Sequence, residues 1–508
     1  MTDRLDALKR RMADLADLHH AASLASWDQQ TMMPPRGGQS RADSLATLER
    51  IAHQLMVSDE TGRLIEGAAA ELNGTPYDSD DASLVRLVRR NWEKARRVPA
   101  DLAEELARAA SVGQEAWVVA RESSDFASFA GHLEHNVELV RRYIDCHAGA
   151  GGFECGYDVV LDDYEPQMKT STVAALFDEL KQELVPLIAE VTAKSQAVDD
   201  SPVHGHFPVS DQRRLVAEIV GMMGFEKAGW RIDDTVHPFA TSIGGGDVRI
   251  TTRWDESYFP AGLYGAMHEC GHGLYEAGIP DSLRRSPLGS GESLGMHESQ
   301  SRLWENMVGR GRSFCGVLAP RIAEVFGGSL AGLEPDALYR AVNSVTPSFI
   351  RVEADEATYS LHIILRFELE QELLDGRLAV RDLPEAWNAR FKDYFGLDVD
   401  NDADGVLQDV HWSAGLIGYF PTYAIGNLIA GQLWELAHAQ TPDLDQRIAT
   451  GELAPLRQWL GQHVHRYGSK FTTTEILERE SAGPISVAPF TRYLKGKLGD
   501  VYGLELGA

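Results

Sequence analysis

Two histidines, four positions apart, lie in residues 266–278, whose sequence is AMHECGHGLYEAG. Each residue of an α-helix advances by about 100°, so His268 and His272 share one face, about one turn apart. Glu269 flanks that face and Cys270 points away from it. Two neutral imidazoles on one face can bind a single tetrahedral zinc ion, while the glutamate between them reaches the water at that ion. The pattern predicts a zinc site with Glu269 as the general base, and it makes Cys270 a packing residue.

A catalytic zinc ion needs a third protein ligand and an open fourth position. Glu276 is too near along the same helix to close the site well. Two further candidates are Glu292, in the loop sequence GSGES, and Glu298, in MHESQSRLWEN. The second segment has helical spacing and could return antiparallel to the first helix, which favours Glu298 because a helix holds its side chain rigidly. The alternative for Glu298 is an ion pair with Arg302, four residues further along that helix.

The helix that must carry the two histidines follows a short β signal. Residues 236–254, VHPFATSIGGGDVRITTRW, contain two β-branched runs joined by three glycines and an aspartate, which predicts a β-hairpin. We expect a helix from about Asp255 to Gly278, with Pro280 beyond it as a stop. The hairpin therefore leads directly into the helix that holds the motif.

Most of the remaining chain has the apolar spacing and charged faces of helices. Ser210 is expected to cap one helix after a loop rich in helix-breaking residues. A second long helix is expected to begin at Pro347, with Thr346 as its cap, and to end at Gly376. No linker divides the sequence convincingly. We expect a single mostly helical domain over residues 1–508, with a small β-hairpin or sheet beside the metal-binding helix.

Composition excludes several classes of partner. The chain has 508 residues, of which 44% are hydrophobic and 24% charged, and this is ordinary for a globular protein. A formal net charge of −28 argues against nucleic acid and anionic membranes as partners. Four scattered cysteines are too few for a disulfide framework, and the first residues lack the apolar run of a signal peptide. These features predict a cytoplasmic protein.

One uncharged stretch, residues 412–434, is long enough to cross a bilayer. It is interrupted by Pro421 and by several glycines, and no basic flank orients it. We expect a buried helix and loop in a large core, with no membrane insertion.

Several ordered motifs resemble those of a known family. The motifs are HPF (237–239), DVRIT (247–251), HECGH (268–272), HESQ (297–300), IRVEAD (350–355) and GVLQDVHW (405–412), with WDQQTMMP (27–34) and YDVVLDDYEP (157–166) before them. In these motifs, nearly end to end, the chain resembles the carboxypeptidase Taq family of thermostable metallocarboxypeptidases.

The resemblance implies a mostly helical, two-lobed peptidase with a deep groove, related in shape to angiotensin-converting enzyme. It implies His268, His272 and Glu298 as the metal ligands and Glu269 as the catalytic base. It also implies a homodimer that acts on the C-termini of peptides with broad preference. The catalytic motifs then fall within residues 237–423.

Peptide hydrolysis also needs donors for the developing oxyanion. His411, in QDVHW, and Tyr423, in FPTYAIGN, are the candidates. The alternative is structural: His411 would pair with Asp409, and Tyr423 would be a buried core residue. Both readings stay open on the sequence.

A carboxypeptidase further needs a fixed cation for the terminal carboxylate of its substrate, and arginine suits this because its guanidinium binds carboxylates bidentately. With the resemblance, Arg351 is the first candidate and Arg249 the second. Against Arg351 stands a helix-surface pair with Asp355, four residues further on. His237 and His297 are expected to line the groove or to support the ligands.

The sequence thus predicts a zinc-dependent metallocarboxypeptidase, in which Co²⁺ is able to replace Zn²⁺. The alternative enzyme is a zinc oligoendopeptidase of the same helical shape. A non-catalytic helical scaffold with a structural metal fits less well, because structural zinc usually has thiolate ligands.

Overall fold

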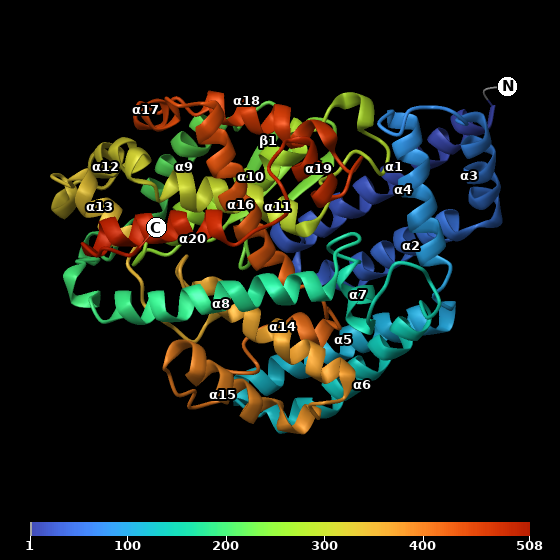
Figure 1. The fold of residues 1–508 in the computed structure, drawn as a ribbon, viewed down its shortest axis with the longest axis horizontal. Coiled ribbons are helices and arrows are strands. Elements are labelled where there is room, and N and C mark those ends of the chain that lie inside the picture. Colours follow the sequence, from blue (N-terminus) through green and yellow to red (C-terminus); the bar gives the residue numbers. More distant parts are fainter. Residues whose placement is uncertain (1–2, 508) are drawn as a thin grey trace. The chain divides into compact units, whose positions relative to one another are not determined.

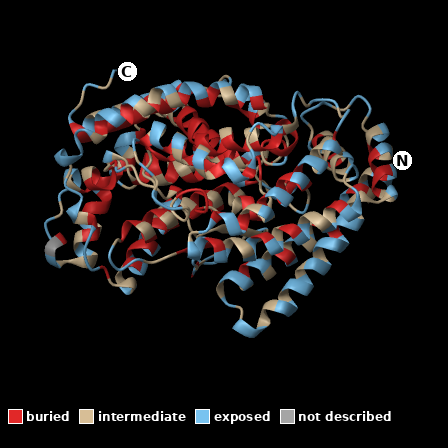
Figure 2. Cartoon of the chain, turned by 90° about the horizontal axis from the view of Figure 1, so that it is seen from below, coloured by how far each residue is buried: buried red, intermediate tan, exposed pale blue. Residues whose placement is uncertain are grey.

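The computed structural model describes residues 3–507 and is mostly helical, as the sequence predicts. Within these residues it has twenty α-helices and a single three-stranded sheet (Figure 1). The outer helices carry buried residues on one side and exposed residues on the other (Figure 2). Contacts within the chain divide it into two compact units, each assembled from three separate segments.

Unit 1 contains residues 1–96, 199–342 and 433–484. An apolar cluster that includes Leu8, Met12, Ile65 and Val88 joins its first helices. The helices of this unit are α1 (Asp3–Thr31), α2 (Gly38–Val57), α3 (Asp59–Glu71), α4 (Asp80–Ala95), α9 (Val209–Met223), α10 (Pro260–Gly278), α11 (Leu294–Arg302), α12 (Arg312–Phe326), α13 (Pro335–Val342), α17 (Leu444–Ala449), α18 (Ala454–His463) and α19 (Thr473–Arg479).

The sheet of unit 1 consists of β1 (Trp230–Asp234), β2 (Ala240–Gly244) and β3 (Asp247–Thr252), in the order β1-β3-β2. Strands β2 and β3 are antiparallel, so the predicted hairpin is confirmed. Its turn needs glycine, since Gly244 and Gly246 have φ of 122° and 88°. Strand β1 pairs with β3 in parallel and was not predicted, because five residues with three charges give only a weak β signal.

Two helices of unit 1 begin at other residues than the sequence suggests. Helix α10 starts at Pro260, five residues after the expected Asp255, whose carboxylate instead accepts hydrogen bonds from the backbone N–H and hydroxyl of Ser257. Helix α9 starts at Val209, with Pro208 preceding it in an extended conformation, so the predicted cap Ser210 lies inside the helix. In both cases proline at the helix start, or just before it, decides the boundary.

Unit 2 contains residues 97–198, 343–432 and 485–508. Its helices are α5 (Ala100–Ser123), α6 (Phe126–Asp145), α7 (Gly156–Leu161), α8 (Thr170–Thr192), α14 (Tyr359–Asp375), α15 (Leu383–Phe395) and α20 (Ala488–Tyr502), and α16 (Pro421–Gln440) begins in it. At its centre the buried carboxylate of Glu370, on α14, accepts hydrogen bonds from Tyr157, Trp412 and the backbone of Gly418.

The predicted long helix from Pro347 to Gly376 is right at its end and wrong at its start. Helix α14 ends at Asp375 and is capped by Gly376, which has φ of 72°, but it begins only at Tyr359. The carboxylate of Asp355 accepts the backbone N–H groups of Thr346 and Thr358, and this holds the intervening chain in loops and one short 3₁₀ turn. Such side-chain bonds to the backbone compete with helix formation.

The uncharged stretch forms a buried helix preceded by a loop, as expected. Helix α16 begins at Pro421, and nearly all of its residues up to Leu433 are buried. Among residues 3–507, no helix combines the length and the apolar character needed to cross a membrane.

Candidate metal site

The structure brings His268, His272 and Glu298 together in unit 1. Both histidines lie on α10 and point their Nε2 atoms at Oε2 of Glu298, on α11, at 3.5 Å each. One ligand atom from each residue lies within 4.8 Å of the others, and no other group of this kind occurs in the described part of the chain. Two imidazole nitrogens and one carboxylate oxygen converging on one point are the donor set of a catalytic zinc ion.

Glycines on α10 allow its neighbours to approach. A Cβ atom on Gly271 would lie 2.7 Å from Cα of Ser301 on α11, and one on Gly273 would lie 2.6 Å from the ring of Trp230 on β1. These distances are too short for any side chain. Helix α11, which carries Glu298, therefore lies close to the histidines only because position 271 has no side chain.

Glu298 has two sets of contacts, one on each carboxylate oxygen. Arg302 donates from Nε to Oε1 at 2.7 Å, and Ser301 donates from its hydroxyl to Oε2 at 3.1 Å. Burial opposes ionisation, but the charge of Arg302 holds the pKa of the Glu298 carboxyl well below its usual range. The ion pair that the sequence offered as an alternative is present, and it orients the carboxylate toward the histidines.

His268 is supported by a second carboxylate. Its Nδ1 lies 2.8 Å from Oε2 of Glu305. Arg302 lies 3.4 Å from the same oxygen, and Arg310 lies 3.4 Å from Oε1 of Glu305. Glu305 lies in a π-helix, Leu303–Gly309, that directly continues α11. π-Helical turns are rare in proteins, and those that occur are often found at functional sites.

His272 is supported by an imidazole. Its Nδ1 lies 2.7 Å from Nδ1 of His297, and Nε2 of His297 lies 2.9 Å from Oε1 of Glu276. Glu276 also accepts the backbone N–H of Gly291 at 3.0 Å. The expectation that His297 supports a ligand agrees with these contacts.

Glu269 lies between the two histidines in the sequence and is 6% exposed. Burial raises the pKa of its carboxyl to about 7. A carboxyl with a pKa in this range is able to take up and release a proton near neutral pH.

Glu292 and Cys270 lie outside the group formed by His268, His272 and Glu298. Glu292 accepts a 2.6 Å hydrogen bond from the hydroxyl of Thr473, and its backbone N–H donates to the hydroxyl of Tyr275. Cys270 is fully buried, and burial raises the pKa of its thiol. Neither side chain contributes an atom to the group formed by the histidines and Glu298.

The second candidate arginine, Arg249, belongs to the sheet of unit 1. It donates from Nε and Nη2 to the two carboxylate oxygens of Asp247, at 2.9 and 2.8 Å, so its Nη1 is outside this pair. Its guanidinium stacks on Trp27 of α1, and so does that of Arg231, its partner in β1. In the sequence, Trp27 is the first residue of the motif WDQQTMMP. His237 precedes β2 and is exposed.

The remaining predicted residues lie in unit 2. His411 Nε2 is 3.4 Å from the hydroxyl of Tyr423, and its Nδ1 is 3.9 Å from Asp409. Burial, with the nearby charges of Arg351 and Arg366, lowers the pKa of His411 to about 4. The imidazole is therefore neutral at pH 7 and is able to donate one N–H.

Arg351 pairs with Asp409 and not with Asp355. Its Nε and Nη2 donate to Asp409 at 3.1 and 2.7 Å, and its Nη1 donates to Tyr359 at 2.8 Å. Arg366 donates to the other oxygen of Asp409 at 2.8 Å. The helix-surface pair with Asp355, which the sequence offered as the alternative, is absent because Arg351 lies in a 3₁₀ turn, where residues four apart do not stack as they do on an α-helix. Asp409 is 58 residues away in the sequence, so no local pattern indicated the pair.

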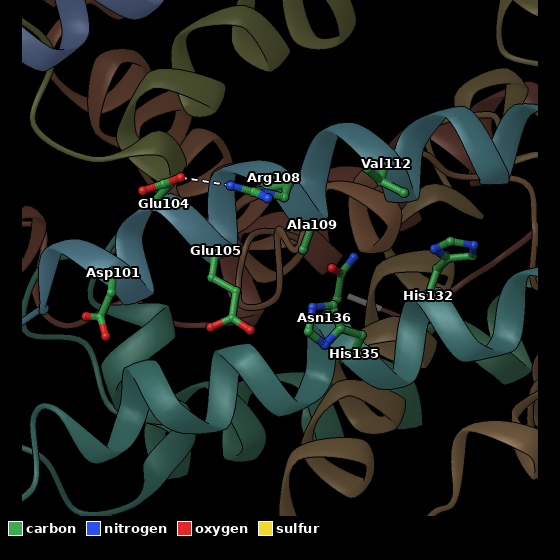
Figure 3. Close-up of a pocket in the computed structure, with 9 residues that line it drawn as sticks. All are labelled: Asp101, Glu104, Glu105, Arg108, Ala109, Val112, His132, His135 and Asn136. Carbon is green, nitrogen blue, oxygen red and sulfur yellow. Dashed lines mark hydrogen bonds and ion pairs between the residues drawn. The ribbon is translucent and has the colours of Figure 1, made fainter.

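A groove of about 520 Å³ lies between α5 and α6 in unit 2 (Figure 3). Two of its acidic side chains are already paired, Glu104 with Arg108 and Glu105 with Arg142. None of the predicted site residues lines it.

A helix with His-Glu-x-x-His, joined by a glutamate from an adjacent helix, defines a metallopeptidase of the two-histidine, one-glutamate type. Comparison with known proteins narrows this class. The family model of the Carboxypeptidase Taq (M32) metallopeptidases matches residues 7–498. The chain belongs to this family, and the protein is a metallocarboxypeptidase.

Individual relatives match over their full lengths. Thermostable carboxypeptidase 1 of Thermus thermophilus is 41% identical over 505 residues, covering 97% of this chain and 98% of that protein. Carboxypeptidase 1 of Bacillus subtilis is 36% identical, covering 98% and 97%. The crystal structure of the M32 carboxypeptidase from Deinococcus radiodurans R1 matches with a TM-score of 0.94 and 36% identity, covering 99% and 100% of the two chains.

Proposed function

We propose that this metallocarboxypeptidase is zinc-dependent and removes single residues from peptide C-termini with broad specificity, and that Co²⁺ is able to replace Zn²⁺. The observation that carries the proposal is the convergence of His268, His272 and Glu298, with Glu269 next to His268 in the chain. When bound, the ion supplies Lewis acidity and lowers the pKa of a water to about 7. Glu269 then takes the proton of the attacking water and passes it to the leaving amine.

His411 and Tyr423 are the proposed donors to the oxyanion. Two properties support this role: the two side chains lie within 3.4 Å of one another, and His411 is neutral at pH 7. A neutral imidazole donates a hydrogen bond without carrying a charge of its own, and preorganised donors of this kind are effective in a buried site.

The terminal carboxylate is proposed to bind an arginine, with Arg351 as the first candidate and Arg249 as the second. Each guanidinium already pairs with one aspartate, Asp409 or Asp247. All three nitrogens of Arg351 donate to Asp409 or Tyr359, whereas the bonds of Arg249 to Asp247 use only Nε and Nη2. Both candidates therefore need to be tested. His237 is proposed as a further substrate contact because it is exposed next to β2.

The deciding experiment compares peptides that have a free C-terminus with the same peptides as C-terminal amides. Free acids should lose residues one at a time and amides should resist, because an arginine facing a neutral amide loses a charge-assisted bond. Truncating one partner of such a pair costs roughly 2–5 kcal/mol, which is tens- to thousands-fold in rate. Equal cleavage of acids and amides at internal bonds would instead indicate an oligoendopeptidase. Metal binding without any turnover would indicate a non-catalytic scaffold.

The same assay identifies the arginine. Arg351→Ala or Arg249→Ala should slow the free acid far more than the amide if that residue binds the carboxylate. Arg231→Ala is the matched control for Arg249, because it too is a sheet arginine that stacks on Trp27 and pairs with an aspartate. The expected homodimer stays a prediction, which light scattering would check.

A further inference from the structure

The two histidines of the candidate site are held in different ways. His268 contacts the carboxylate of Glu305 directly. His272 contacts a carboxylate only through an intermediate ring, in the order His272, His297, Glu276. A metal-bound histidine usually donates its second N–H to an acceptor that fixes its tautomer and its orientation.

The positions of the protons along this chain of contacts follow from the geometry. His272 directs Nε2 at the cluster, so its proton is on Nδ1 when Nε2 binds a metal. Nδ1 of His297, at 2.7 Å, must then accept, and its own proton is on Nε2. That N–H donates to Oε1 of Glu276 at 2.9 Å. Every hydrogen bond has one donor and one acceptor only in this direction.

The carboxylate at the end of the chain is itself fixed. Glu276 lies one turn after His272 on α10, and Oε1 also accepts the N–H of Gly291 from the loop that precedes α11. His297 is the residue next to Glu298 and lies against the ring of Tyr275, with ring centroids 5.0 Å apart. Neither His297 nor Glu276 belongs to the group of convergent ligand atoms.

We propose that His297 and Glu276 are positioning residues that set the tautomer and the orientation of His272 for metal binding. They form a two-residue relay, in which Glu276 keeps the proton of His297 on Nε2 and thereby leaves Nδ1 of His297 as the acceptor for His272. The inference rests on the proposed metal site, and it makes the two histidine ligands unequal, one supported by an anion and the other by a neutral ring.

Two substitutions at position 297 separate this role from simple packing. His297→Leu removes the acceptor, and His297→Asn retains an oxygen at the place of Nδ1. Both lose the ring contact with Tyr275, so a difference between them reports on the acceptor alone. Competition between the protein and a chelator for Zn²⁺ should show that His297→Leu lowers the protein's Zn²⁺ affinity by about 10- to 100-fold. His297→Asn should recover most of that loss.

The relay also predicts how two changes combine. Glu276→Leu leaves the Nε2–H of His297 without its acceptor and should weaken Zn²⁺ binding in the same direction. Added to His297→Leu it should cause little further loss, because the relay is already broken. His465→Gln is the matched control: His465 is buried, lies near Tyr275 and bonds to Gln300, but it is outside the relay. The Zn²⁺ affinity of the His465→Gln variant should equal that of the wild type.

Nitrogen NMR of the zinc-loaded protein tests the proton positions directly. The relay requires the Nδ1–H tautomer for His272 and the Nε2–H tautomer for His297. The proposal is overturned if His297 carries its proton on Nδ1, if Leu and Asn at position 297 bind Zn²⁺ equally well, or if the losses in the double variant add. A wild-type protein that binds no Zn²⁺ would refute the proposed function, whereas a relay that fails in a zinc-binding protein would leave that function standing.

Discussion

Glu298 accepts a 2.7 Å hydrogen bond from Nε of Arg302 through Oε1, and it presents Oε2 to the Nε2 atoms of both His268 and His272. The arginine thus holds the carboxylate in an orientation in which one oxygen is available to a metal. Arg302 is also 3.4 Å from Glu305, the residue that contacts the other side of His268. One guanidinium therefore positions two carboxylates on opposite sides of the same imidazole.

Removal of the third ligand should lower metal content. Glu298→Ala should reduce Zn²⁺ occupancy strongly, because two imidazoles alone bind zinc weakly. Glu292→Ala is the control and should keep nearly full occupancy, since Glu292 bonds to Thr473 outside the cluster. Metal analysis after dialysis measures both. The reverse result would place the third ligand in the loop.

Substitution of the base should separate binding from turnover. Glu269→Gln should retain Zn²⁺ and lose about 10²- to 10⁴-fold in kcat, because an amide cannot accept a proton from water. The measurement is kcat on a free-acid peptide together with metal content. If the variant contains no metal, Glu269 holds the site together and is not the base.

A methyl group on Gly271 should disturb the site without changing any ligand. Gly271→Ala places Cβ 2.7 Å from Cα of Ser301, so α11 has to move away and take Glu298 with it. Overpacking of this kind costs about 1–3 kcal/mol of unfolding free energy, and Zn²⁺ affinity should fall as well. Gly265→Ala on the same helix is the control, because its nearest contact is Thr252 at an ordinary 3.4 Å. Equal Zn²⁺ affinity in the two variants would contradict the packing argument.

Glu370 should make the stability of the protein depend on pH. Burial outweighs three donated hydrogen bonds and raises its pKa from 4.5 to about 7 in the folded state. The neutral carboxyl therefore contributes stability below pH 4.5, and this contribution is lost as the pH rises to about 7. The rise corresponds to about 3 kcal/mol. Urea unfolding in chelator should show the difference between wild type and Glu370→Gln falling over this range. A constant difference would show that Glu370 is ionised throughout.

The sequence was most informative where a pattern is local. Two histidines and a glutamate within five residues need only a helix to share a face, and the β2–β3 hairpin needs only its glycine turn. The structure confirms both elements. Helix α11 could also be expected to return toward the motif, because its spacing is helical.

What could not be predicted depends on partners far apart in the chain. The start of α14 is set by Asp355, and Arg351 finds Asp409 only after folding. The relay joins His297 on α11 to His272 and Glu276 on α10, and the spacing of the motif does not reveal these contacts. Strand β1 is stabilised by pairing with β3, so its own composition says little.

The division of the chain has a consequence for its synthesis. Unit 1 is assembled from residues 1–96, 199–342 and 433–484, and unit 2 from the segments between and after them. A ribosome therefore releases the last part of unit 1 only after most of unit 2, and neither unit is complete until nearly the whole chain has emerged. Contacts between such distant segments slow folding and expose apolar surface in the meantime. We expect fragments cut at any of the five boundaries between these segments to aggregate, and the nascent chain to depend on chaperones until its last helix is made.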